Sequence, residues 1–269
     1  MNGVNRFLLA VLLLLGVQAQ AYQDDYISVS LLSEDSALQP GGTHWLGVQF
    51  KPADHWHVYW QNPGDSGQAP QIRWNLPQGV TVGEVHWPAP EQIPVPPLMT
   101  YGYHQVLLMV PVTLADDVAV GKPLSIGADV RWLVCEEVCI PGKAKLNLEL
   151  PVADSRQKSS AVEHFIQARK QLPAANNLNA SYQLQGNRVV VELFKDMTGN
   201  RQSPVIYPIT QDLVSYAELP TLNQQGKRLV ADFALNDYFS KTPSSFDFVI
   251  VFGPEAVYQV KASYLSQGE

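Results

Sequence analysis

The sequence has few charged residues and lacks the common signatures of nucleotide-binding and hydrolytic proteins. Charged side chains make up 16% of the 269 residues and hydrophobic ones 46%, so the chain can form a folded core and is not disordered. Its 18 basic and 25 acidic residues give a net charge of −7, which argues against a nucleic acid or an anionic membrane as the main partner. No phosphate-binding glycine motif and no Ser/His/Asp order is present, and we expect no cofactor.

Long hydrophobic runs are also lacking beyond the N-terminal segment. The run over residues 7–17 is shorter than the ~20 residues that a membrane span needs. It follows the positive charge of Arg6 and precedes the small-residue end Ala19-Gln20-Ala21. This pattern predicts a cleavable secretory signal peptide over residues 1–21, with an uncleaved anchor as the alternative. We therefore expect export to a compartment in which disulfides can form.

The uneven distribution of residue types indicates two domains. All six Trp, both Cys and five of the six His precede residue 153, and the remainder is richer in Asn, Gln and Tyr. Between the halves, residues 154–172 predict a helix, with Ser160 and Glu163 as a capping box and Pro173 at its end. The expected divisions are a first domain over residues 22–152, a helical connector over 153–173 and a second domain over 174–269.

Elsewhere the hydrophobic pattern has a period of two, as in half-buried strands. In the first half this pattern covers residues 26–32, 43–50, 105–112 and 144–150. In the second half, strands at 182–185 and 188–194 flank a Gly186-Asn187 turn, and further strands are expected at 228–234, 246–252 and 257–264. Short strands separated by Gly, Pro and Asn turns predict an all-β protein with two tandem immunoglobulin-like β-sandwich domains joined by a short helix.

The segment Cys135-Glu-Glu-Val-Cys139-Ile-Pro-Gly142 is the candidate for chemistry. In an extended strand, residues four apart lie ~13 Å from one another at ~3.3 Å per residue. A disulfide needs Cα atoms within roughly 7 Å. A bond between these two cysteines therefore requires a turn or a bulge over residues 136–138.

Three roles for the cysteine pair are compatible with the sequence. A structural disulfide would close a short ring that restricts the unfolded chain by only ~2 kcal/mol, so it would stabilise little. Strained or exposed disulfides are typically the exchange-active ones, which favours a redox role. Alternatively, both thiols could bind copper(I) or zinc with His55 and His57, whose spacing places two imidazoles on one face of a strand. The ligand spacing matches no closed zinc pattern, so we predict no metal site.

Carboxylates near the thiols should influence their chemistry. Glu136 and Glu137 lie between the cysteines and should raise the pKa of both thiols, with Lys143 offsetting part of the effect. Poorer leaving groups would make the disulfide react mainly with a docked partner. Glu136, Glu137 and Asp65 are candidate proton relays, although Asp65 could instead serve the turn that contains it.

Three upstream motifs accompany the cysteine segment in a fixed order. They are His55-Trp-His-Val-Tyr-Trp60-Gln-Asn-Pro-Gly64-Asp-Ser-Gly67, Trp87-Pro-Ala-Pro90 and Tyr101-Gly-Tyr103. With Val130-Arg-Trp-Leu-Val-Cys135-Glu-Glu-Val-Cys139, they resemble the N-terminal periplasmic (alpha) domain of DsbD-type thiol:disulfide interchange proteins, and within these the ScsB branch associated with suppression of copper sensitivity. The resemblance covers most of residues 40–152 and is weaker over 175–265, where the ScsB branch is expected to carry a second immunoglobulin-like domain.

The resemblance implies an immunoglobulin-like electron carrier in the periplasm. In this family a membrane domain and a thioredoxin-like domain reduce the disulfide, and the dithiol then reduces thioredoxin-fold proteins such as disulfide isomerases. Carried over, Cys139 would form the mixed disulfide with the partner and Cys135 would resolve it. A capping loop in the family maps to residues 98–103, although its tyrosines could equally be ordinary core aromatics. The residues that would shield the sulfurs are Met99, Thr100, Tyr101 and Tyr103.

The chain departs from the DsbD pattern in three respects. Only three residues separate its cysteines, Thr100 stands where the DsbD cap carries Phe, and neither a membrane domain nor a Cys-x-x-Cys thioredoxin module is present. As a protein-disulfide reductase component it would depend on a separately encoded DsbD-type membrane electron donor, or it would be a truncated product. The alternative function is a non-catalytic periplasmic copper-binding or interaction module with a structural disulfide.

Overall fold

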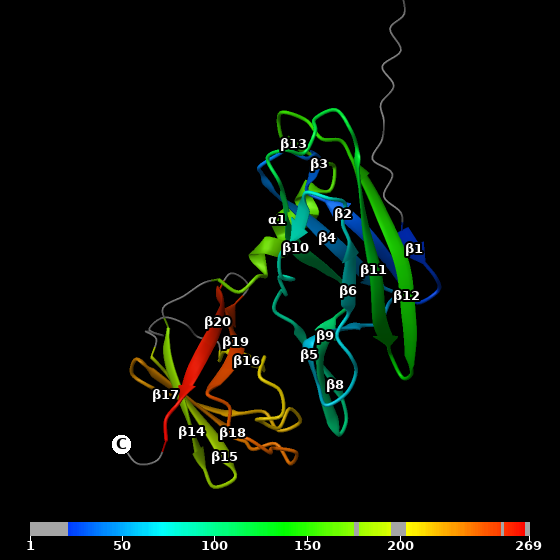
Figure 1. Ribbon diagram of the computed structural model, residues 1–269. Coiled ribbons are helices and arrows are strands. Elements are labelled where there is room, and N and C mark those ends of the chain that lie inside the picture. Colours follow the sequence, from blue (N-terminus) through cyan, green and yellow to red (C-terminus); the bar gives the residue numbers. More distant parts are fainter. Residues whose placement is uncertain (1–20, 175–177, 195–202, 254–255, 267–269) are drawn as a thin grey trace, which may run out of the picture.

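The computed structural model describes residues 21–174, 178–194, 203–253 and 256–266, which form strands and one helix (Figure 1). The predicted signal peptide falls outside these residues except for Ala21, the first residue of a strand. Within the described part, no helix is long and apolar enough to cross a membrane.

The first half of the chain forms two facing sheets and a smaller sheet at one end (Figure 1). The larger sheet has the order β1-β2-β4-β10-β7 and is formed by β1 (Ala21–Gln23), β2 (Ile27–Ser33), β4 (Thr43–Pro52), β10 (Val106–Leu114) and β7 (Val80–Val82). The facing sheet contains β12 (Cys139–Leu150), β11 (Leu124–Cys135) and β6 (Gln71–Asn75). The small sheet near the second half contains β5 (Val58–Gly64), β9 (Leu98–Tyr103) and β8 (Glu91–Val95).

The alternation predicted for these strands is seen in their burial. Every second residue of β2 is buried, and β11 has the same pattern over most of its length. Because alternate side chains point to opposite faces of a sheet, these residues fill the space between the two sheets. Strand β10 is buried on both faces: Leu108 and Val110 join the main core, whereas Leu107 and Met109 join a second cluster beneath the helix.

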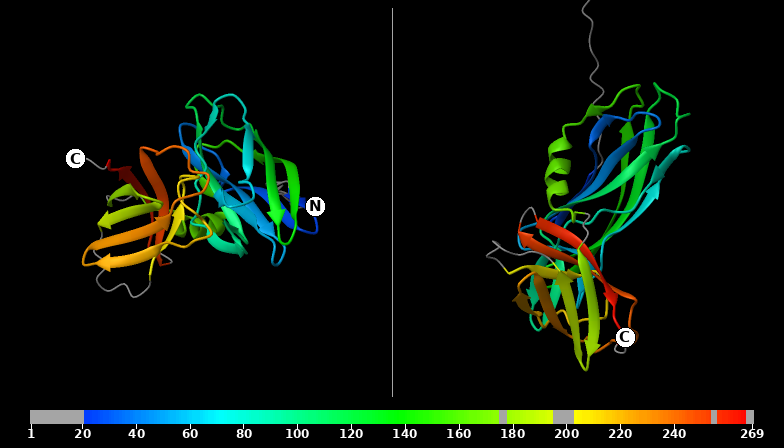
Figure 2. Two further views of the ribbon diagram at one scale, coloured as in Figure 1. Left: turned by 90° about the horizontal axis from the view of Figure 1, so that it is seen from below. Right: turned by 90° about the vertical axis from the view of Figure 1, so that its left-hand side faces the viewer.

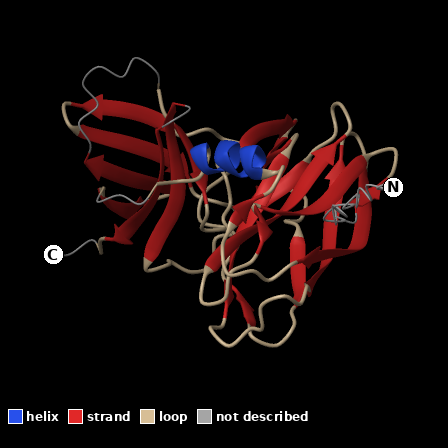
Figure 3. Ribbon diagram, turned by 90° about the horizontal axis from the view of Figure 1, so that it is seen from above, coloured by secondary structure: helices blue, strands red, loops and turns tan. Residues whose placement is uncertain are grey.

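The helix α1 (Val162–Lys170) is shorter than the predicted helix over residues 154–172. The chain before it is extended, because β13 (Gln157–Lys158) pairs with β3 (Asp35–Ala37). The predicted capping box is wrong: Ala161 is the N-cap residue without a side-chain cap, and the Ser159 hydroxyl accepts the Ala161 N–H. Phe165 packs α1 against the outer face of β10. Figure 2 and Figure 3 show α1 lying on the first half, at the side where the two halves of the molecule meet.

Charged side chains fix the segment around α1 to the first half. Arg169 of α1 donates two hydrogen bonds to the carboxylate of Glu34, at 2.9 and 2.6 Å. Lys158 lies 3.1 Å from oxygens of both Glu34 and Asp35. Asp35 also bonds His44 at 2.8 Å, and both of these side chains are fully buried. Buried carboxylates need such partners, so this network fixes the path of the connecting segment.

The second half forms one seven-stranded sheet with the order β16-β19-β20-β14-β15-β18-β17. Its strands are β14 (Asn179–Gln185), β15 (Arg188–Phe194), β16 (Val205–Pro208), β17 (Thr221–Gln225), β18 (Arg228–Ala234), β19 (Ser245–Gly253) and β20 (Ala256–Tyr264). The parallel β14–β20 pair joins two groups of strands that pack on each other (Figure 1). Phe246 of β19 contacts the rings of Tyr182 and Phe233 from the other group. The all-β prediction with two immunoglobulin-like, sandwich-like domains is confirmed.

The two halves meet through an aromatic cluster. Tyr101 of β9 contacts the rings of Tyr207 and Tyr216, with centroids 5.6 and 5.8 Å apart, and Trp60 contacts Tyr207. The side-chain amide of Asn62 donates hydrogen bonds to the carbonyl of Pro208 at 2.9 Å and to the hydroxyl of Tyr216 at 3.2 Å. The small sheet β5-β9-β8 is therefore the contact surface for the second half.

Candidate functional site

The hairpin of β11 and β12 brings the two cysteines together. Cys135 ends β11, Cys139 begins β12, and the two are the last cross-strand pair of the hairpin. Their Cα atoms are 4.2 Å apart and their sulfurs form a disulfide. The turn required by the sequence is present: the Glu136 N–H donates to the Val138 carbonyl at 3.2 Å. Glu136 and Glu137 are exposed in this turn.

The two cysteines have different environments. Cys135 is buried, with 2% of its surface exposed, whereas Cys139 is exposed. The backbone of Cys135 is paired with His57, which precedes β5, through two hydrogen bonds of 2.9 and 3.0 Å. Cys139 has the sulfur that a partner can approach, and Cys135 is held beneath it.

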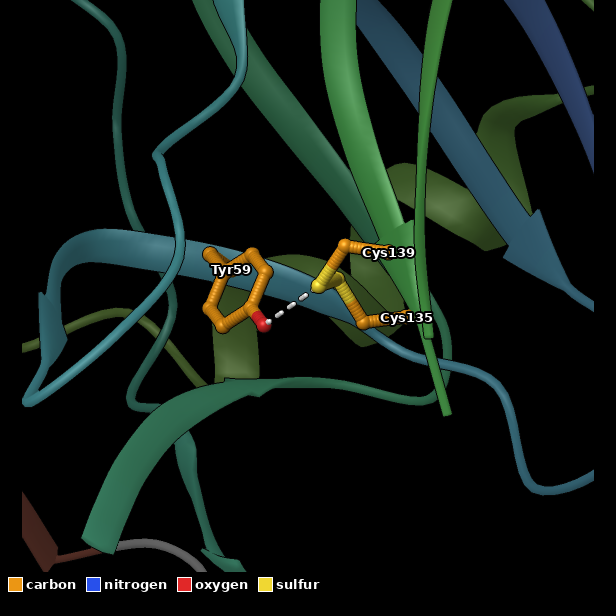
Figure 4. Close-up of a disulfide and its surroundings, with 3 residues drawn as sticks. All are labelled: Tyr59, Cys135 and Cys139. Atoms are coloured by element: carbon orange, nitrogen blue, oxygen red, sulfur yellow. Dashed lines mark hydrogen bonds between the residues drawn. A yellow bond between two sulfur atoms is a disulfide. The ribbon is translucent and has the colours of Figure 1, made fainter. Parts of the chain in front are cut away.

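The Tyr59 side chain contacts the disulfide directly (Figure 4). Its hydroxyl lies 3.6 Å from the Sγ of Cys139, and because a disulfide sulfur carries no hydrogen the hydroxyl donates. The ring lies against Gly67, whose φ is +96° and where a Cβ atom would come within 2.2 Å of the ring. Burial raises the pKa of Tyr59, with a hydrogen bond to Ser66 opposing the effect, so the phenol keeps its proton at neutral pH.

Tyr59 belongs to the motif over residues 55–67, but the sequence alone did not indicate a role for it. Two features of the sequence could have identified it as a site residue: Tyr59 is two residues after His57, and it precedes a dense group of turn residues. His57 and Tyr59 make an edge contact, with ring centroids 5.1 Å apart. Gly67, the last residue of this group of turn residues, lies against the Tyr59 ring.

His57 supplies a neutral imidazole beside Tyr59. Burial, together with the nearby His104, lowers the pKa of His57 to about 4, so the ring is uncharged at neutral pH. Among the described residues its Nε2 has no hydrogen-bond partner. The ring therefore lines the site without adding a charge.

The predicted cap residues lie on β9, which pairs with β5 and β8. The Met99 N–H donates to the carboxylate of Asp65 at 2.8 Å, and the Asp65 N–H donates to the Met99 carbonyl at 2.9 Å. The Thr100 hydroxyl donates to the Ile93 carbonyl at 2.8 Å. These contacts fix β9 in place, and the Asp65 carboxylate joins the turn after β5 to β9.

Tyr101 and Tyr103 are buried at 3% exposure and have other neighbours. The Tyr103 hydroxyl donates to the Pro88 carbonyl at 2.7 Å, and Tyr101 belongs to the aromatic cluster between the halves. Burial is the main cause that raises the pKa of both tyrosines. The structure thus joins Tyr59, rather than these two rings, to the sulfur.

The residues considered for metal binding are not arranged as expected. His55 lies in a turn with a φ of +72°, so it does not share a strand face with the buried His57, and that expectation is wrong. Both candidate thiols are joined in the disulfide. Over the part of the chain that the structure describes, no three His, Cys, Asp or Glu side chains are grouped to hold a metal ion.

The arrangement is suited to thiol–disulfide exchange. It presents one exposed sulfur with a hydroxyl donor beside it and a buried sulfur as its bonded partner. A thiolate that attacks Cys139 would release Cys135, and the Tyr59 hydroxyl would be in place to donate to Cys139 whenever that sulfur is a thiolate.

This chain is similar to known proteins in sequence and in structure. A family model described as thiol:disulfide interchange protein DsbD, N-terminal, matches residues 28–151. The crystal structure of the N-terminal periplasmic domain of ScsB from Proteus mirabilis aligns with a TM-score of 0.66 and 20% identity, covering 90% of this chain and 94% of that chain. Domains 5–6 of the S-layer protein SbsC align at 11% identity over 93% of this chain and 100% of that chain, but their TM-score of 0.24 is too low to inform the fold. No curated protein matches the sequence.

Proposed function

We propose that this chain belongs, through residues 28–151, to the family of the N-terminal domain of the thiol:disulfide interchange protein DsbD, and that it passes electron pairs between proteins through Cys135 and Cys139. The family match supports a module of the thiol–disulfide interchange type over residues 28–151. The observation that carries the proposal is the unequal exposure of the two cysteines, since one sulfur is open to a partner and the other is buried. Disulfides that are exposed are the ones that typically exchange.

The proposed cycle balances as two exchanges. A donor thiolate attacks the Sγ of Cys139, the Cys135–Cys139 bond breaks, and Cys135 leaves as a thiolate that takes up a proton. The donor's second thiol then displaces Cys139, so the donor is oxidised and the pair is reduced by two electrons. In the second exchange the Cys139 thiolate attacks the disulfide of the protein to be reduced, and Cys135 resolves the mixed disulfide.

The predicted site residues have distinct parts in this proposal. Tyr59 hydrogen-bonds the Cys139 sulfur, while the contacts of Met99, Thr100, Tyr101 and Tyr103 keep β9 beside the site. Exposed Glu136 and Glu137 can pass protons between the thiols and water. Asp65 is committed to the Met99 N–H and is a weaker relay candidate.

We further propose a periplasmic location and thioredoxin-fold partners. The DsbD family and the periplasmic domain of ScsB support both, and the N-terminal signal peptide would provide export. A separately encoded DsbD-type membrane protein would supply the electrons. The domain limits given above and a link to copper tolerance belong to the same proposal, and the copper link rests only on the likeness to ScsB.

The reduction potential of the Cys135–Cys139 pair tests the proposal. The protein is equilibrated with glutathione buffers, alkylated, and analysed by mass spectrometry for oxidised and reduced forms. We expect ready equilibration with a potential near or above about −250 mV, as for exchange-active proteins. A bond that stays oxidised below about −300 mV and does not react with thioredoxin-fold proteins would identify a structural disulfide and reject electron transfer.

A further inference from the structure

The outer face of the β6-β11-β12 sheet carries a cluster of basic side chains. Register pairs Arg131 with Lys143 across β11 and β12, and places Asp129 between Arg73 of β6 and Lys145 of β12. The four cations are exposed, in a protein whose net charge is −7. We call these four residues, Arg73, Arg131, Lys143 and Lys145, the basic face.

The fold gives no structural reason for this cluster. Among the described residues none of the four cations lies within ion-pair distance of a carboxylate, although Asp129 is the cross-strand neighbour of Arg73 and Lys145. Like charges directly opposite each other on neighbouring strands, such as Arg131 and Lys143, destabilise a sheet. The loss of stability from this repulsion has an explanation if the charges form a binding surface for a partner.

The basic face leads toward the disulfide along β12. At ~3.3 Å per residue, Lys143 lies ~13 Å and Lys145 ~20 Å along the strand from Cys139. Between them and the cysteines is a hollow of about 510 Å³, lined by Arg131, Lys143, Leu133, Pro141, Gln68 and Ala69 among others. Figure 1 shows β11 and β12 on the side of the first half away from the second half, and the four cations are exposed there.

Apart from Asp129, the acidic groups near the basic face lie at its ends. Glu136 and Glu137 occupy the hairpin turn, and Glu149 lies at the far end of β12. Asp129 is the acidic residue within the face. The surface therefore changes sign between the turn and the middle of the hairpin, which sets the orientation of a charged partner.

We propose that the basic face docks a partner protein whose reactive cysteine lies beside an acidic surface patch, about 13–20 Å from that cysteine along the bound surface. This inference rests on the proposed function and names the charge of its partner. When the partner's carboxylates lie over the basic face, its thiol reaches Cys139, while Glu136 and Glu137 repel the opposite orientation. Such charge complementarity mainly increases the rate of productive encounter.

Synthetic dithiol peptides provide the test. Each peptide contains Cys-Gly-Gly-Cys followed by a tail. In the tail, the residues four to six positions beyond the second cysteine are all Asp, all Asn or all Lys. Each peptide is used to reduce the oxidised full chain. The readout is the rate at which Cys135 and Cys139 become alkylatable, measured by mass spectrometry at about 10 mM and 500 mM salt, where the screening length falls from ~30 Å to a few Å. Dithiothreitol, an uncharged dithiol, measures the intrinsic reactivity of the disulfide.

At low salt we expect the Asp peptide to reduce the disulfide about tenfold faster than the Asn peptide, and the Lys peptide to be the slowest. At high salt the differences between these rates should fall below about twofold. The double variant Arg131→Gln with Lys143→Gln should lose most of the Asp advantage while reacting normally with dithiothreitol. The control Lys122→Gln with Lys241→Gln changes the net charge equally at exposed sites outside the face and should keep the advantage. Two outcomes would reject docking on the basic face but leave the proposed function standing. One is a normal reaction with dithiothreitol without faster reaction of the Asp peptide, and the other is an equal loss of the Asp advantage in both double variants. A disulfide inert to every dithiol rejects the proposed function and this inference with it.

Discussion

Cys135 and Cys139 form one bond but have different surroundings, and this difference comes from neighbouring side chains and backbone. Cys135 is paired through its backbone with His57 and is buried, whereas Cys139 lies at the surface under the Tyr59 hydroxyl. A hydrogen bond to a charged sulfur is stronger than one to a neutral sulfur. Tyr59 should therefore matter most when Cys139 is a thiolate.

Replacing Tyr59 by Phe keeps the ring against Gly67 and removes only the hydroxyl. A hydrogen bond to a charged group contributes about 1.5–3 kcal/mol, and 1.36 kcal/mol corresponds to one pKa unit. We expect the Tyr59→Phe change to raise the pKa of the Cys139 thiol by about 1 unit. Its reaction with iodoacetamide at neutral pH should slow by roughly tenfold, and the pH profile of this alkylation in the reduced protein gives the measurement.

Tyr238→Phe is the matched control, because Tyr238 is 85% exposed in the second half. It should leave the alkylation profile of Cys139 unchanged. If Tyr59→Phe also left the profile unchanged, the hydroxyl would have no part in stabilising the thiolate.

The helix α1 stabilises the fold through the one face that packs on β10. Phe165 is fully buried against Leu107 and Met109, while its neighbour Ile166 is 41% exposed. Truncating a buried Phe leaves a cavity and costs about 3–5 kcal/mol. We expect Phe165→Ala to lower the free energy of unfolding by that amount in urea titrations. Ile166→Ala, in the same helix, should cost less than about 1 kcal/mol, and equal losses would show that α1 does not contribute through this contact.

The docking of α1 should also depend on pH. Hydrogen bonds from Arg169, followed by those from Lys158, lower the pKa of Glu34 below its ordinary value of 4.5. The folded state binds this proton more weakly than the unfolded state, so the stabilisation is present above that value and is lost as the pH falls below it. Glu34→Gln should therefore reduce the loss of unfolding free energy between about pH 5 and pH 3 by roughly 1–3 kcal/mol. Glu149→Gln, at an exposed site of β12, should retain the wild-type acid dependence.

On the scale of the whole molecule, the two halves are joined where the small sheet β5-β9-β8 meets the second domain. Burial is the main cause that raises the pKa of Tyr207 to about 12, so its phenol remains neutral in this contact. The side-chain amide of Asn62 joins the two halves by hydrogen bonds to Pro208 and Tyr216. Strand β9, which carries the predicted cap residues, is thus held from the second half as well.

Asn62→Asp should weaken this joint. The change replaces the amide donor with a carboxylate 2.9 Å from the Pro208 carbonyl, while keeping the oxygen that accepts the Gly64 N–H. An unpaired buried charge is strongly unfavourable, so we expect the halves to separate. The radius of gyration from small-angle X-ray scattering should increase, and proteolysis between residues 153 and 173 should become at least several-fold faster. Asn223→Asp on exposed β17 should change neither, and an unaltered scattering profile for Asn62→Asp would mean that other contacts suffice.

Local patterns in the sequence were sufficient for the strands and for the cysteine hairpin. The period of two identified residues 228–234, which form β18 with these bounds, and the predicted turn over residues 136–138 lies between β11 and β12. The resemblance to the DsbD N-terminal domain was likewise readable from short motifs, because these place particular residue types in a fixed order. Alternation and turn chemistry depend on neighbours in the chain, so a single sequence records them.

Only the tertiary structure decided which distant residues meet. Tyr59 reaches Cys139 across 80 positions of sequence, Asn62 reaches Pro208 across 146, and the strand register places Arg131 beside Lys143. The length of α1 was also set from outside, because pairing of β13 with β3 keeps the preceding residues extended. Side chains from separate strands come together through sheet order, register and packing, which no local pattern records. The sequence by itself thus determined the elements and the reactive pair, and the packing of those elements determined what surrounds the pair.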